Sequence, residues 1–121
     1  MAEPGGDPKR TTADLAALPP ELAQQSLSQT TMILPHDAAV KAIELLTQRG
    51  RRLESWEGWV KLRNGSRARS LNHDGSFALS PDPARAATAA TAAIRKAQSA
   101  WDRNPEYLDG ALYFSLSFGA A

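Results

Sequence analysis

The chain has 121 residues, a formal net charge of +1, an apolar share of 42% and no cysteine. This length fits one domain with a modest core, and the lack of cysteine excludes disulfides and thiolate chemistry. No stretch approaches the roughly 20 apolar residues of a membrane span, and the first residues lack the apolar segment of a signal peptide. We therefore expect a single cytoplasmic domain.

The first residues differ in composition from the rest of the chain. Proline, glycine and charged residues dominate residues 1–12, and Pro19 and Pro20 stop any helical turn that forms before them. We predict that residues 1–24 form a disordered or loosely docked tail. Residues 25–121 then form one folded domain.

A strand and a helix are predicted next. Residues 29–34 are rich in β-branched and apolar side chains and end at Pro35, which indicates a short strand. Residues 36–49 carry apolar side chains at helical spacing, and Gly50 follows at the position where glycine commonly ends a helix. The spacing predicts a helix with its apolar face on the core.

Residues 52–63 alternate as in a half-buried strand, and Asn64-Gly65 is a strong hairpin signal. The even positions from Glu54 to Leu62 are mainly apolar or glycine, whereas the odd positions from Leu53 to Arg63 are mainly polar. A two-residue loop would pair Leu62 with Arg67 and turn the returning strand's arginines onto the apolar face. A three-residue loop of residues 64–66 would instead pair Arg63 with Arg67.

The register of this hairpin decides where Arg67 and Arg69 point, because a slip by one residue turns every side chain to the other face. Burying two unpaired guanidinium groups costs more free energy than forming a bulged loop. We therefore predict the three-residue loop, with both arginines pointing outward beside Trp59 and Lys61.

The second half of the chain reads as turn, strand, helix and strand. Residues 72–75 suggest a tight turn, and residues 76–80 a third short strand. Asp82 is a predicted N-cap for a helix over residues 84–103, whose stripe of small apolar residues suits packing on a sheet. Residues 111–118 alternate most clearly of all, and we expect this strand in the middle of the sheet.

These elements predict an α+β fold. We expect a two-layer sandwich, with an antiparallel or mixed sheet of four to five strands and two helices on one face. The order of strands and helices favours the ferredoxin-like topology. The opposite sheet face is then left without a helix to cover it.

That uncovered face is the candidate binding site. Residues 49–69 hold seven basic and two acidic side chains, so positive charge gathers on the hairpin. The predicted binding residues combine basic and aromatic groups: Trp59, Lys61, Arg63, Arg67, Arg69 and Tyr113. We predict a non-enzymatic domain of an accessory, inhibitor or immunity-like kind, which binds a protein partner or a second copy through this face.

Two other functions stay open. Basic groups interleaved with aromatic rings also suit single-stranded nucleic acid, although no RNP-like motif is present. A small enzyme could use His73 beside Asp74 as an acid-base pair. The two histidines and scattered carboxylates lack metal-ligand spacing, and no phosphate-binding or nucleophile motif occurs, so we expect neither metal nor cofactor.

Overall fold

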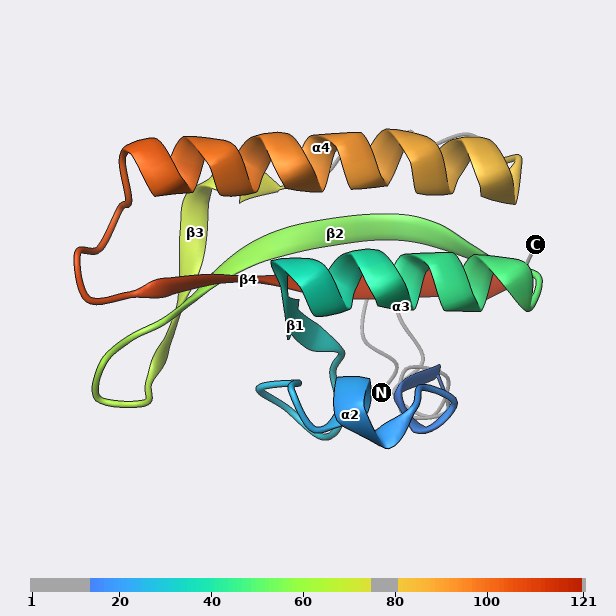
Figure 1. Ribbon diagram of the computed structural model, residues 1–121, viewed down its shortest axis with the longest axis horizontal. Helices are drawn as coiled ribbons and strands as arrows, with labels where there is room; N and C mark the ends of the chain where they lie inside the picture. The colour runs from blue at the N-terminus through green and yellow to red at the C-terminus, as the bar shows by residue number, and fades with distance from the viewer. Residues whose placement is uncertain (1–13, 75–80, 121) are drawn as a thin grey trace, which may run out of the picture.

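The computed structural model describes residues 14–74 and 81–120, without the side chains of residues 71–74 and 120. After a helical turn at residues 14–16, the elements follow in the order shown in Figure 1: α2 (Pro20–Ala23), β1 (Ile33–Pro35), α3 (His36–Gln48), β2 (Arg51–Lys61), β3 (Arg67–Asp74), α4 (Pro83–Arg103) and β4 (Ala111–Ala120).

The four strands form one antiparallel sheet in the order β1-β4-β2-β3. The α+β class is confirmed, and β4 lies in the interior of the sheet as predicted. In the ferredoxin-like topology the first and third strands are central, whereas β4 and β2 are central here. The observed order therefore does not confirm that topology, and the two-layer sandwich stays a prediction.

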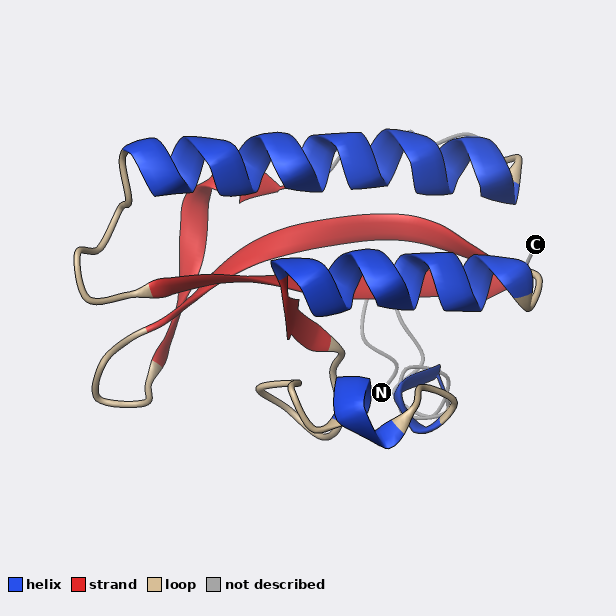
Figure 2. Ribbon diagram, in the orientation of Figure 1, coloured by secondary structure: helices blue, strands red, loops and turns tan. Residues whose placement is uncertain are grey.

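Each long helix connects two strands that lie on either side of a third. Helix α3 joins β1 to β2 across β4, and α4 joins β3 to β4 across β2. The two helices run side by side (Figure 2), and their buried residues share one apolar cluster with β2 and β4. The core therefore lies between the helices and the two central strands.

Helix α4 follows the predicted pattern closely. It begins at Pro83, and the Asp82 carboxylate accepts a hydrogen bond of 3.3 Å from the backbone N–H of Arg85. Its buried stripe consists of Ala86, Ala90, Ile94, Ala97 and Trp101. Small side chains on this stripe allow the helix to lie close to β2.

Strand β2 contains an irregularity that strict alternation does not predict. Leu53 pairs with Phe118 and Ser55 with Ser117, so Glu54 is an extra residue between two pairs. Such a bulge reverses the facing of the residues before it. Leu53 is therefore 0% exposed in the core, which corrects its predicted place on the polar face. Glu54 lies at the rim instead, with its carboxylate 3.7 Å from Arg52.

The hairpin between β2 and β3 has the predicted outward arginines and a three-residue loop, but the loop begins one residue earlier than predicted. The Leu62 N–H donates to the Ser66 carbonyl at 2.8 Å, and the Gly65 N–H donates to the Leu62 carbonyl at 2.9 Å. The loop is thus residues 63–65, and Arg67 pairs with Lys61 instead of Arg63. The pairing moves by two residues, which preserves the facing of every side chain.

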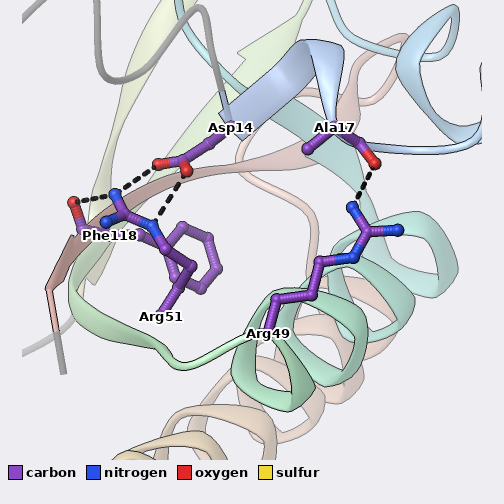
Figure 3. A network of polar contacts seen from close by, with 5 residues as sticks. All are labelled: Asp14, Ala17, Arg49, Arg51 and Phe118. Carbon is purple, nitrogen blue, oxygen red and sulfur yellow. Dashed lines mark hydrogen bonds and ion pairs between the residues drawn. The ribbon is translucent and has the colours of Figure 1, made fainter.

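The segment before β1 packs on the body of the protein (Figure 3). Leu15 and Leu18 belong to the core cluster, and the Asp14 carboxylate accepts two hydrogen bonds of 3.0 Å from the Arg51 guanidinium. Arg49 donates to the Ala17 carbonyl at 2.6 Å. Residues 14–18 are therefore joined to the connection between α3 and β2. The division into a tail of 1–24 and a domain of 25–121 stays a prediction.

Two further expectations concern the region after the hairpin. Residues 72–74 continue β3, so the turn predicted to begin at residue 72 is wrong at these positions. The strand predicted over residues 76–80 lies outside the described residues. Among the helices of the described ranges, none has both the length and the apolar character needed to cross a membrane.

Candidate functional site

Five of the six predicted binding residues lie on one face of the sheet. Trp59 is the cross-strand partner of both Arg69 on β3 and Tyr113 on β4. Two residues along β2, Lys61 is the partner of Arg67. Directly opposed residues in a sheet point to the same side. The structure therefore brings together a basic-aromatic row and an adjacent pair of cations.

Arg63 does not belong to this row. It lies in the hairpin loop, and its guanidinium is 3.9 Å from the Asp109 carboxylate, with both side chains more than 70% exposed. An exposed ion pair at this distance contributes little stability. Its geometric effect is to place Arg63 beside the loop between α4 and β4.

The cations of the face differ in their surroundings. Arg69 forms an ion pair of 2.5 Å with Glu57, which lies two residues before Trp59 on the same strand. Lys61 and Arg67 are exposed and have no ion pair within the described part of the chain. The uncompensated positive charge is therefore concentrated at the hairpin end of the sheet.

The accessible part of the face is smaller than the sequence suggested. Glu57, Ser115 and Ile33 form the row on the other side of Trp59, and both Ser115 and Ile33 are buried. Trp59 and Tyr113 are half-buried, whereas Lys61 and Arg67 are exposed. Contact with a large partner is therefore possible mainly from Trp59 toward the hairpin loop.

Sequence reasoning missed two apolar residues near this end. In the described ranges, Tyr107 and Leu108 are the large hydrophobic residues that remain exposed, at 41% and 91%. They line a hollow of about 510 Å³ together with Leu62, Arg63, Asn64, Glu106 and Asp109. The sequence feature that could have indicated them is the presence of two apolar residues in a loop, directly after Asn104-Pro105 ends the helix.

A hydrogen bond and a close backbone approach hold this loop beside the hairpin. The Ser70 hydroxyl donates to the Glu106 carboxylate at 2.5 Å, and the Gly110 N–H donates to the Tyr107 carbonyl at 3.1 Å. A Cβ at Gly110 would lie 2.6 Å from the Val60 side chain, so glycine permits this close approach to β2. We name Leu62, Arg63, Tyr107 and Leu108, which line this hollow, the hairpin-end surface. Lys61 and Arg67 point to the other face of the hairpin.

A second hollow, of about 800 Å³, lies between the start of α3 and the last turns of α4. His36 lines it, with Nδ1 2.7 Å from the Asp37 carboxylate and Nε2 buried without a hydrogen-bond partner. Arg95, Gln98 and Asp102 line the opposite side. Across residues 14–74 and 81–120, no cluster of three or more histidine and carboxylate side chains could hold a metal ion.

The alternative acid-base pair, His73 and Asp74, lies on β3, but these side chains fall outside the described residues.

Comparison with protein-family models, curated proteins and solved structures finds no match. The functional interpretation therefore depends on the geometry of the sheet face and the hairpin-end surface.

Proposed function

We propose that this protein is a non-enzymatic binding domain that recognises another protein through its basic-aromatic sheet face. The observation that carries the proposal is the row formed by Arg69, Trp59 and Tyr113, with exposed Lys61 and Arg67 next to it. Tryptophan, tyrosine and arginine are the residues that most often dominate binding energy at protein interfaces. A half-buried indole also needs little ordering before it contacts a partner.

The charge pattern favours a protein over a nucleic acid. Affinity for nucleic acids comes largely from cations that neutralise phosphates. Arg69 is paired with Glu57, and Arg63 lies near Asp109. These carboxylates would repel a phosphate backbone, whereas a protein surface can offer them hydrogen-bond donors. We therefore retain single-stranded nucleic acid only as the alternative against which the proposal is tested.

The partner is a different protein or a second copy of this chain. An accessory, inhibitor or immunity-like role fits a small domain that offers a contact face of this kind. A homodimer through the same face would place like charges from Lys61 and Arg67 near each other, which is unfavourable unless carboxylates intervene. A different partner with acidic groups avoids that repulsion.

The proposal is tested by affinity capture from a lysate of the source cells, using the wild type and Trp59→Ala. Captures at low and moderate salt, each with and without nuclease, separate the two classes of partner. We expect a protein that is retained after nuclease treatment and at moderate salt. Its recovery should fall at least about tenfold with Trp59→Ala, as for a central hot spot.

The same experiment can contradict the proposal. Capture that disappears with nuclease, or that weakens steeply with salt, would assign the face to nucleic acid. Equal binding by the wild type and Trp59→Ala would show that the sheet face does not contribute to the interaction. Light scattering on the purified protein identifies a homodimer, which Trp59→Ala should convert to a monomer.

A further inference from the structure

We infer that the basic-aromatic sheet face binds an extended, proline-rich partner segment that carries an acidic side chain between its prolines. This inference rests on the proposed protein-binding function and specifies the chemistry of the partner. Three features of the face support it: a row of flat rings across the strands, a covered border on one side of that row, and a pair of cations on the other side.

The row of flat rings crosses three neighbouring strands. Tyr113 on β4 is the cross-strand partner of both Trp59 on β2 and Pro35 on β1, and directly opposed residues point to the same side of a sheet. All three side chains are half-buried, so each is partly held by the protein and partly accessible. Proline-rich segments bind to aromatic surfaces, and their polyproline II conformation exists before binding, which lowers the entropic cost.

The covered border determines the direction of a long ligand. Ser115 and Ile33 form the next pair along β4 and β1, and they point to the same side as Tyr113 and Pro35. They are nevertheless only 8% and 3% exposed. A ligand that followed the strands past Tyr113 would meet this covered region, so an extended ligand has to run across the strands, along the row.

The spacing of strands along the row matches the repeat of a polyproline II helix. Pro35 and Trp59 lie on strands that are separated by β4, and strands two apart in a sheet are about 9.6 Å from each other. In polyproline II, residues three apart recur on the same side about every 9.3 Å. The first and fourth residues of a Pro-x-x-Pro segment can therefore contact the row at the same time.

The cations form the third feature. Lys61 and Arg67 are directly opposed on β2 and β3, and they lie two residues along the strands from Trp59 and Arg69, on the same side of the sheet. Both are exposed, and neither has an ion pair in the described part of the chain. Directly opposed like charges destabilise a sheet, and a carboxylate bound between them would relieve that repulsion.

The two sides of the row therefore offer different groups to the residues between the prolines. With three residues per turn, the two intervening side chains point to opposite sides of the row. One side has the cation pair, about 6.8 Å away along the strands, which an aspartate or glutamate side chain can approach. The other has Glu57, which is already paired with Arg69. We therefore expect an acidic residue at only one of the two intervening positions.

The test is a peptide array with a Pro-x-x-Pro core, in which the two intervening positions take every amino acid except cysteine. The intact protein is the probe, at moderate salt, and a second array replaces both prolines with alanine. We expect binding to the first array, with Asp or Glu enriched at one intervening position. For a selected peptide, loss of the prolines or Trp59→Ala in the protein should each weaken binding about tenfold, as loss of an interface anchor does.

Charge reversal provides a readout that loss of folding could not produce. Arg67→Glu places a carboxylate opposite Lys61, so the acidic preference should disappear. The double variant Lys61→Glu with Arg67→Glu should instead enrich Lys or Arg at that position. Lys96→Glu is the matched control, because Lys96 is exposed on α4, and it should keep the acidic preference. Circular dichroism and thermal unfolding verify that each variant is folded.

Several results would overturn the inference. Equal binding to both arrays would show that proline is not recognised, and an acidic preference that survives in the double variant would place the cation contact elsewhere. If neither array binds while capture from a lysate still depends on Trp59, the sheet face remains a protein-binding site for a partner of different chemistry. If that capture is also indifferent to Trp59→Ala, the proposed function itself fails.

Other occupants of the face would give different results. A fluorescent oligothymidine that binds the wild type and is lost with Trp59→Ala, while the arrays stay blank, would assign the face to single-stranded nucleic acid. A dimer in sedimentation that Trp59→Ala dissociates would make a second copy the occupant. Either result would contradict a proline-rich partner.

Discussion

Asp14 illustrates how one side chain joins the beginning of the described chain to the sheet. Its carboxylate is 10% exposed and faces the Arg51 guanidinium with two hydrogen bonds (Figure 3). The same guanidinium approaches the Phe118 carbonyl on β4 at 3.5 Å. Bidentate pairs of this geometry are stronger than single contacts, and removing one partner leaves a charge with incomplete solvation.

We predict that Asp14→Asn lowers the free energy of unfolding by roughly 2–3 kcal/mol, below the full cost for a buried pair because Arg51 keeps some contact with water. Urea denaturation followed by tryptophan fluorescence measures the change. Asp109→Asn is the matched control, since it removes the same charge from an exposed pair and should cost less than about 1 kcal/mol. Equal effects of the two substitutions would contradict this interpretation.

At the scale of elements, the hairpin is the segment whose loop sequence determines how the proposed binding residues are oriented. Its loop depends on Gly65, whose φ of +90° is unfavourable for residues with a side chain. Asn64 supports the turn, because its Oδ1 accepts a hydrogen bond of 2.9 Å from the Ser66 N–H. The loop in turn fixes the register that faces Arg67 and Arg69 toward the binding surface.

We predict that Gly65→Ala destabilises the protein by about 1–2 kcal/mol, because alanine is strained at this backbone conformation. Gly65→Asn should cost less, since asparagine tolerates positive φ better than other residues. Thermal unfolding compares the two variants. If alanine and asparagine destabilise equally, the backbone conformation of residue 65 is not the cause of the effect.

At the scale of the whole molecule, residues 14–18 contribute to the same apolar cluster as the helices and the sheet. Leu15 and Leu18 are both buried members of that cluster. A loosely docked tail would release such residues without affecting the domain. A segment that belongs to the core would instead unfold together with it.

We predict that Leu18→Ala lowers the free energy of unfolding by about 2–3 kcal/mol, as for loss of a buried leucine near the edge of a core. Leu108→Ala, at an exposed leucine, should change it by less than about 0.5 kcal/mol. Fluorescence and circular dichroism should report the same transition. An unaltered midpoint for Leu18→Ala would support the tail of residues 1–24 predicted from composition.

The sequence alone was sufficient to place α3, α4 and β4, and to predict which way Arg67 and Arg69 face. These features depend on neighbouring residues: apolar spacing, the Asp82 cap, the prolines and glycines at helix ends, and the cost of burying guanidinium groups. Each can be evaluated without knowing what lies across the sheet.

Only the tertiary structure decided the strand order, the bulge at Glu54, and the pairing of Arg69 with Glu57. It also brought Tyr107 and Leu108 beside the hairpin loop, about forty residues away along the chain. These features arise because residues that are distant in sequence become neighbours in the fold. The packing of the whole sheet then determines the burial of Leu53 and the close approach of Gly110 to Val60.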